Sequence, residues 1–294
     1  MAVPTRTRLA TRLATLLATC IVVSAGCTDG DDQETEDPIE PSPSSTPSPS
    51  ESALPERFSV QVYFVGETPM GTRLFQEVRQ VQVASPVDEA LALLTAADVL
   101  DPDYSTLLPA GAPTVVPGDH SKAIGVNLPS SDWTERPPGM SRSEARLAVQ
   151  QIVYTLQATL RSEAPVEFFY DGLAPIFGID KPSFRAAPQN AVLALVNVAV
   201  PMEGTIVEDV FDAGGVANSF EATVPWEIRN EEGRFVQRGV TNAAGWGDHL
   251  YPWVANVDVS SLAPGTYTFV AMTDDPSDGE GAGPTEDTKT ITVR

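Results

Sequence analysis

The sequence predicts two folded domains of different class, an α+β domain followed by an all-β sandwich, behind an N-terminal region without a fold. Three observations lead to this expectation. A basic and then apolar run ends at Cys27 and opens an acidic, Pro/Ser-rich stretch; strand and helix patterns then alternate, and the last third shows strand patterns alone. The expected parts are a signal peptide (1–26), a stalk (27–56), the α+β domain (57–172), a linker (173–189) and the sandwich (190–294).

The N-terminal run has the layout of a bacterial lipoprotein signal peptide. Three arginines precede an apolar stretch at 13–23, and the small residues Ser24, Ala25 and Gly26 lead into Cys27. The apolar stretch is too short to cross a hydrocarbon core, which takes roughly 20 residues. Ser24 departs from the usual lipobox, which has a larger aliphatic residue there. We expect lipid attachment at Cys27, with plain secretion or a retained anchor as alternatives.

The charge of the chain limits its partners. There are 18 basic and 40 acidic residues, and loss of the signal peptide leaves 15 against 40, a net charge of about −25. This charge argues against nucleic acid and anionic membrane surfaces as direct partners. The mature chain has no cysteine besides Cys27, so an intramolecular disulfide and a thiolate metal site are excluded. We expect no cofactor and no metal.

The stretch from Thr28 to Pro55 contains almost no apolar residue that could offset the entropy cost of ordering the chain. Its acids and prolines favour an extended, disordered segment. We interpret it as a spacer that holds the folded domains away from the membrane.

The first domain shows the order β, β, α, β, α, β, which predicts a small mixed sheet with two helices on one face. Apolar residues alternate along 58–65, and helical spacing follows two expected capping boxes, at Ser85–Asp88 and at Ser141–Glu144. The expected strands are 58–65, a stretch within 74–83, 123–128 and 166–170, and the expected helices begin near 86 and 142 and run for about three turns and to about 162.

Five short sequences in this domain carry a family resemblance: VYFV, VDEALALL, LLPAGAP, IGVNL and AVQQIVYTLQATLRSEAPVEFFYDG. In this order they resemble the GerMN domain of sporulation and germination proteins, which also occurs in LpqB-like envelope lipoproteins. The resemblance covers essentially all of 57–172. It implies a ring-building-motif-like α/β fold and a role in envelope assembly, without a catalytic site.

The following segment, 173–189, has three prolines and little periodicity, although Ile176, Phe177 and Phe184 are apolar enough to dock on a neighbouring domain. The remainder predicts seven strands in an all-β sandwich. These strands are 192–200, 204–207, 217–228, 234–240, 254–259, 266–272 and 289–293.

Three stretches of the sandwich, VAVPMEGTIV, NSFEATVPWEIRNEEGRFVQRG and GTYTFVAMTDDPSDGEG, resemble the germination-associated immunoglobulin-like (Gmad) domain that is often found beside GerMN. The resemblance implies an immunoglobulin-like fold. It transfers no activity to a named residue.

No pattern predicts a catalytic centre. His120 and His249 fall in different predicted domains, and neither a Gly-x-Ser-x-Gly elbow nor a His-Glu-x-x-His motif is present. Carboxylates are abundant, so a hydrolase with two acids stays open, because sequence spacing cannot show the separation that such a mechanism needs.

Three further features have residue types that occur in binding sites. The acidic loop Asp274–Glu280 surrounds a glycine but lacks the spacing of a calcium loop, so a solvated turn is the favoured interpretation. The glycine-rich stretch 279–283 does not join a strand to a helix, which argues against a phosphate cradle. Trp226, Trp246 and Trp253 are interpreted as core residues, with an exposed ligand face as the alternative.

Taken together, these patterns predict a non-enzymatic, lipid-anchored, extracytoplasmic envelope protein that acts through other envelope proteins or the cell wall. Two alternatives stay open. One is a carbohydrate- or peptidoglycan-directed hydrolase with paired carboxylates, and the other is a regulatory partner of a membrane sensor kinase.

Overall fold

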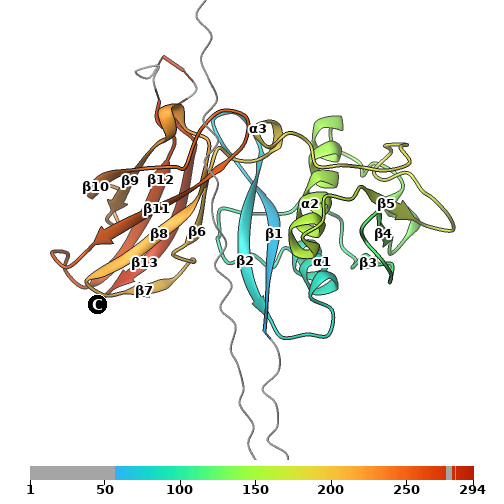
Figure 1. The fold of residues 1–294 in the computed structure, drawn as a ribbon, viewed down its shortest axis with the longest axis horizontal. Helices are drawn as coiled ribbons and strands as arrows, with labels where there is room; N and C mark the ends of the chain where they lie inside the picture. The colour runs from blue at the N-terminus through green and yellow to red at the C-terminus, as the bar shows by residue number, and fades with distance from the viewer. Residues whose placement is uncertain (1–56, 276–279, 282) are drawn as a thin grey trace, which may run out of the picture. The chain divides into compact units, whose positions relative to one another are not determined.

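The computed structural model describes residues 57–275, 280–281 and 283–294, all of which belong to one compact unit (Figure 1). The expected signal peptide, the stalk and Cys27 lie outside the described residues. Both expected fold classes are confirmed, because an α+β domain is followed by a sandwich made only of strands apart from one short 3-10 turn.

The strands of the first domain divide into two sheets instead of one. β1 (Phe58–Gly66) and β2 (Arg73–Val81) form an antiparallel pair, and β3 (Thr114–Val115), β4 (Ile124–Asn127) and β5 (Val166–Phe169) form a second, mixed sheet. α1 (Pro86–Ala96) and α2 (Arg142–Leu160) lie between the two sheets (Figure 1). The expected single sheet is therefore corrected. The physical reason is that α2 buries residues on several faces and packs with both sheets in one core.

Polar side chains on the buried face of α2 complete the free edge of β1. Thr155 Oγ1 accepts a hydrogen bond from the Tyr63 backbone N–H at 3.0 Å, and Gln151 Nε2 donates one to the Tyr63 carbonyl at 3.0 Å. Both side chains are fully buried. Because buried backbone groups need partners, these two residues take the place of a neighbouring strand.

The two helices begin in different ways. At Ser141 the expected capping box is confirmed, since its hydroxyl accepts from the Glu144 N–H and the Glu144 carboxylate accepts from the Ser141 N–H. At Ser85 the expected capping box is wrong. The Ser85 hydroxyl donates to Asp88, whose other carboxylate oxygen accepts from the Val115 N–H, so this carboxylate ties α1 to β3.

The segment between the expected domains packs on the first one. Ile176, Phe177 and Phe184 are buried in its core, as their apolar character suggested. The ring of Phe177 packs against that of Trp133 in a tilted arrangement, with centroids 5.5 Å apart, and Phe184 makes two backbone hydrogen bonds with Val166. The short helix α3 (Gln189–Val192) then leads into the second domain.

The second domain is a sandwich of a five-stranded and a three-stranded sheet. The five-stranded sheet has the order β10-β9-β12-β13-β7, and the three-stranded sheet has the order β11-β8-β6. Alternating residues of both sheets fill the core. The strands are β6 (Val196–Val200), β7 (Thr205–Val207), β8 (Val210–Ala217), β9 (Thr223–Arg229), β10 (Phe235–Asn242), β11 (Tyr251–Asp258), β12 (Gly265–Met272) and β13 (Glu286–Val293).

The sandwich has eight strands among the described residues, where the sequence predicts seven. The missed strand, β8, contains Gly214 and Gly215, which weaken the alternating apolar pattern that marks a strand. Gly215 is required by packing, because a Cβ there would overlap the backbone carbonyl of Asn197 on β6. Gly215 thus both weakens the strand pattern in the sequence and allows the close approach of β6.

Candidate functional site

Strand β13 places two charged residues on its buried face. Along Glu286–Val293 every second residue is buried, and this series runs Asp287, Lys289, Ile291, Val293. The period-two geometry of a strand explains the series, since alternate side chains share one face. Asp287 and Lys289 are therefore buried together with the apolar residues of the sandwich core.

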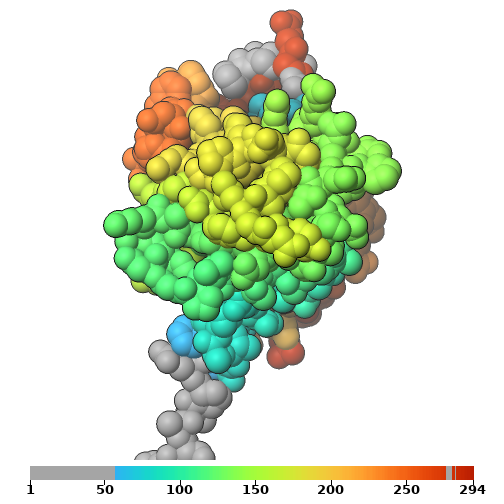
Figure 2. Space-filling view, turned by 90° about the vertical axis from the view of Figure 1, so that its right-hand side faces the viewer, coloured from blue at the N-terminus to red at the C-terminus, as the bar shows by residue number. Residues whose placement is uncertain are grey.

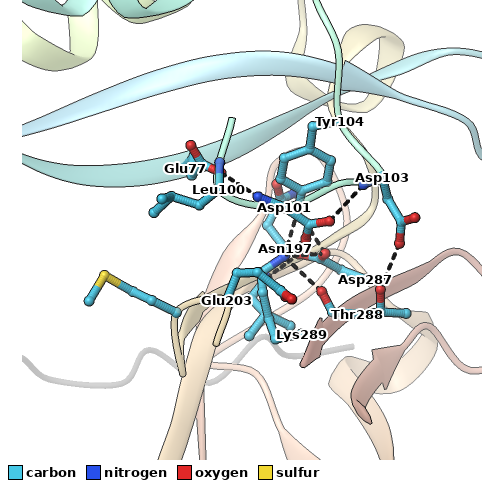
Figure 3. Close-up of polar contacts among 12 residues, drawn as sticks. Glu77, Leu100, Asp101, Asp103, Tyr104, Asn197, Glu203, Asp287, Thr288 and Lys289 are labelled. Atoms are coloured by element: carbon cyan, nitrogen blue, oxygen red, sulfur yellow. Dashed lines mark hydrogen bonds and ion pairs between the residues drawn. The ribbon is translucent and has the colours of Figure 1, made fainter. Parts of the chain in front are cut away.

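The loop after α1 supplies the partners of these two residues (Figure 3). Lys289 Nζ lies 2.6 Å from Asp101 Oδ2, 2.8 Å from Asp287 Oδ1 and 2.8 Å from the Tyr104 hydroxyl. The Tyr104 hydroxyl donates to Asp287 Oδ1 at 2.7 Å, and the Val198 N–H donates to Asp287 Oδ2 at 2.6 Å. We call the four side chains Asp101, Tyr104, Asp287 and Lys289 the junction cluster. It joins the first domain to the sandwich.

A second carboxylate holds the loop in place. Glu77 Oε1 accepts hydrogen bonds from the Leu100 and Asp101 N–H groups, at 2.8 and 3.1 Å, and its other oxygen pairs with Arg79 at 2.9 Å. Asp101 in turn accepts from the Asp103 N–H at 2.9 Å. The loop is therefore preorganised from within the first domain, and Asp101 is presented to Lys289 as a fixed partner.

Burial and charge act in opposite directions within the cluster. Burial raises the pKa of Tyr104 well above its usual value, and the carboxylates of Asp287 and Asp101 raise it further. Burial alone would lower the pKa of Lys289, but Asp287 and Asp101 outweigh it, so the pKa of Lys289 is raised. Burial also raises the pKa of Asp287, against the opposing effect of Lys289. The ammonium thus stays charged, and the Tyr104 phenol stays neutral, at physiological pH.

Further contacts between the domains surround the cluster. Asn197 Oδ1 accepts from the Gln76 N–H at 2.8 Å, and the Thr288 hydroxyl donates to Asp103 Oδ2 at 2.9 Å. An apolar cluster lies alongside, in which Tyr63, Leu74 and Tyr154 of the first domain meet Leu193 and Leu250, at the start of the second domain and within it. Polar and apolar contacts together fix the two domains to each other.

The cluster has the residue types of an acid/base centre but not the space. Its Lys289 borders a cavity of about 10 Å³, which is room for about one water molecule. Lys289, Asp101 and Asp287 are at most 5% exposed. A substrate could not reach these carboxylates, so the arrangement supports a structural role.

The histidines do not form a site together. His249, on the second domain, is exposed and lies 2.7 Å from Asp248, with its ring against Tyr251. The backbone carbonyl of His120, on the first domain, accepts a hydrogen bond from the Ser162 hydroxyl. Within the described part of the chain, no group of three or more His, Cys, Asp or Glu side chains could hold a metal ion.

The tryptophans divide between core and surface. Trp226 and Trp253 are buried in the sandwich, as the sequence indicated, whereas Trp246 is 52% exposed and pairs with the ring of Phe220. The shared aromatic ligand face is thereby ruled out. Parts of the acidic loop Asp274–Glu280 and of the glycine-rich stretch 279–283 lie outside the described residues.

The sequence patterns did not predict the junction cluster. One local signal points to it, since Asp287 and Lys289 continue the alternation of the apolar residues that follow them. Their partners Asp101 and Tyr104 stand more than 180 positions earlier, in a turn-rich stretch without periodicity.

No helix in the described ranges has the length and apolar character to cross a membrane.

Comparisons with known proteins agree with these two domains. Residues 61–175 match the Germane family model, described as sporulation and spore germination, and residues 195–280 match the Gmad2 model, described as the immunoglobulin-like domain of bacterial spore germination. No curated protein matches this chain.

Two solved structures show low similarity. The tandem GerMN domains of the sporulation protein GerM from Bacillus subtilis share 13% identity over 70% of this chain and 62% of that one, with a TM-score of 0.33. The endo-beta-1,4-mannanase from Thermotoga petrophila shares 11% identity over 54% of this chain and 37% of that one, with a TM-score of 0.24. These two scores are too low to support a functional argument.

Proposed function

We propose that this chain, whose two domains match the Germane and Gmad2 family models, acts as a non-enzymatic, lipid-anchored scaffold of the cell envelope. The observation that carries the proposal is the junction cluster. It holds the two domains in one arrangement and leaves no room for a substrate beside its charged groups. A scaffold needs such a fixed geometry, whereas an enzyme with two carboxylates needs an open one.

The cost of burying charge supports this interpretation. Taking an ammonium and two carboxylates out of water costs several kcal/mol per ion, and apolar residues of similar volume often serve stability as well or better. Buried charges do favour one arrangement over others, because a shifted interface would leave them without partners. The cluster therefore selects a single relative position of the two domains, which suits a protein that presents two surfaces at once.

Membrane attachment is proposed to come from a lipid on Cys27. The arginines, the short apolar stretch and the Ala25-Gly26-Cys27 sequence support it. The test is a membrane fractionation of cells that express the full chain, Cys27→Ala and Cys20→Ala. We expect only Cys27→Ala to leave the membrane fraction. Unchanged partitioning of Cys27→Ala would refute the anchor, and loss in both variants would point to a general defect in secretion.

Contacts with other envelope proteins or the cell wall are tested by crosslinking in intact cells. The captured proteins and glycan are identified by mass spectrometry, with the Cys27→Ala chain as the control for attachment. We expect envelope components to be captured by the anchored chain in preference to the control. Hydrolysis of purified peptidoglycan by the full chain, abolished by a single carboxylate substitution, would contradict the proposal and favour the hydrolase.

A further inference from the structure

A wide groove on the first domain collects positive charge in an otherwise acidic protein. Its volume is about 1010 Å³, and it is bordered by the β1–β2 turn, the loop before α2, the first turns of α2 and the segment that follows β5. Figure 2 shows the first-domain side of the molecule, where the yellow segment after β5 lies against green residues from earlier in the chain. The groove is distinct from the junction cluster, with which it shares no residue.

Cations outnumber acids around this groove by six to two. The acids are Glu144 and Asp180, and the cations are Arg73, Arg136, Arg142, Arg146, Lys181 and Arg185. The whole chain has only 18 lysines and arginines, so a third of them border one groove. Within the described residues none of the six is in an ion pair, whereas Arg79, Arg229 and Lys289 all are.

The nearby groups do not neutralise these cations. Glu144 uses its carboxylate to cap the Ser141 N–H at the start of α2, at 2.7 Å. Arg73 donates from Nη1 to the Thr72 carbonyl, and its buried Nε has no acceptor among the described residues. The start of α2 adds the positive end of a helix dipole. The groove therefore has a local positive potential.

We propose that this groove binds a flexible linear polymer that carries a phosphate group in each repeat. Five of the six cations are arginines, whose planar guanidinium matches two phosphate oxygens at once. They come from four separate segments of the chain, which spreads the charge along the groove. Spread charge suits a ligand with repeated charges more than a single small anion. The acidic remainder of the surface repels such a polymer, so its contact is confined to the groove.

The border of the groove favours a polymer of this kind over an acidic peptide. An extended peptide gains affinity through main-chain hydrogen bonds to a free strand edge. Apart from Arg73 at the start of β2, the cations that line the groove stand on helix α2 and on loops. The inference rests on the proposed function in one respect, because the envelope location is what brings such polymers within reach.

The test measures binding of sodium polyphosphate of defined length to the full chain by titration calorimetry. The variant Arg142→Gln/Arg146→Gln removes two exposed cations from the groove. The matched control, Arg234→Gln/Arg238→Gln, removes the same charge from an exposed part of the second domain. We expect the affinity for polyphosphate to fall about tenfold or more in the groove variant, because this variant loses two exposed charge contacts with the ligand. The affinity of the control should fall little.

Two further titrations identify the ligand class. Inorganic phosphate should bind far more weakly than polyphosphate, and poly-L-glutamate of matched charge should bind more weakly as well. The proposal is overturned if polyphosphate does not bind, if both double variants lose affinity equally, or if poly-L-glutamate binds as tightly. Since the titration does not depend on Cys27, a failure here and a failure of the membrane fractionation are separate results.

Discussion

Replacing Lys289 by methionine removes the ammonium of the junction cluster and keeps most of the side-chain volume. Two carboxylates then lose their common counter-ion, while Asp101 stays about 2% exposed and Asp287 about 1%. Removing one partner of a buried ion pair typically costs about 3–5 kcal/mol, and burial this complete calls for no reduction for solvent screening. For a folded unit of this size, that loss lowers the melting temperature by roughly 6–20 °C.

The assay is chemical and thermal unfolding of the full chain, followed by circular dichroism. Lys122→Met is the matched control, because Lys122 is exposed and belongs to no ion pair found among the described residues. It should change the free energy of unfolding by less than about 0.5 kcal/mol. If Lys289→Met is as mild as this control, the cluster does not hold the domains together and the reasoning fails.

A triple variant separates the charge effect from packing. Adding Asp101→Asn and Asp287→Asn to Lys289→Met leaves no buried charge in the cluster, so much of the lost stability should return. Such recovery would appear as a coupling energy of about 0.5–3 kcal/mol between neighbouring sites. Strictly additive losses would mean that shape, and not charge, accounts for the effect of the single change.

Three further predictions concern the pH response of the junction cluster, the core of the first domain and the packing of the sandwich. The free energy of unfolding should fall as the pH rises above about 10. The folded pKa values of Lys289 and Tyr104 are raised above the unfolded values of 10.5 and 10.0, so unfolding releases protons there. Urea unfolding at several pH values should show a smaller alkaline loss of stability for Tyr104→Phe, and an identical loss would exclude this phenol as a source of the pH dependence. Phe177→Ala should cost about 3–5 kcal/mol, because the side chain is 1% exposed in the first-domain core; an unchanged denaturation midpoint would show that the segment after β5 is only a linker. Gly215→Ala should cost about 1–3 kcal/mol through overlap with the neighbouring strand, whereas Gly265→Ala, with ordinary contacts, should be mild; equal midpoints for the two variants would contradict the close approach.

The order of the elements could be predicted from the sequence, because it depends on local patterns. The alternation of apolar residues along β1 and their helical spacing after Ser141 depend on residues close together in the sequence. The capping box at Ser141 likewise joins residues only three positions apart. The sequence failed where a local pattern met a distant partner. Asp88 is an example, since its carboxylate caps no helix and accepts from the Val115 N–H instead.

By itself, the sequence determined the two fold classes, their order along the chain and the two families to which the domains correspond, since short-range periodicity and motifs encode all three. Only the tertiary structure decided that the first domain splits into two sheets, that Lys289 meets Asp101, and that six scattered cations border one groove. These features join residues from distant parts of the chain. Their energies come from burial and charge in three dimensions, which no local spacing records.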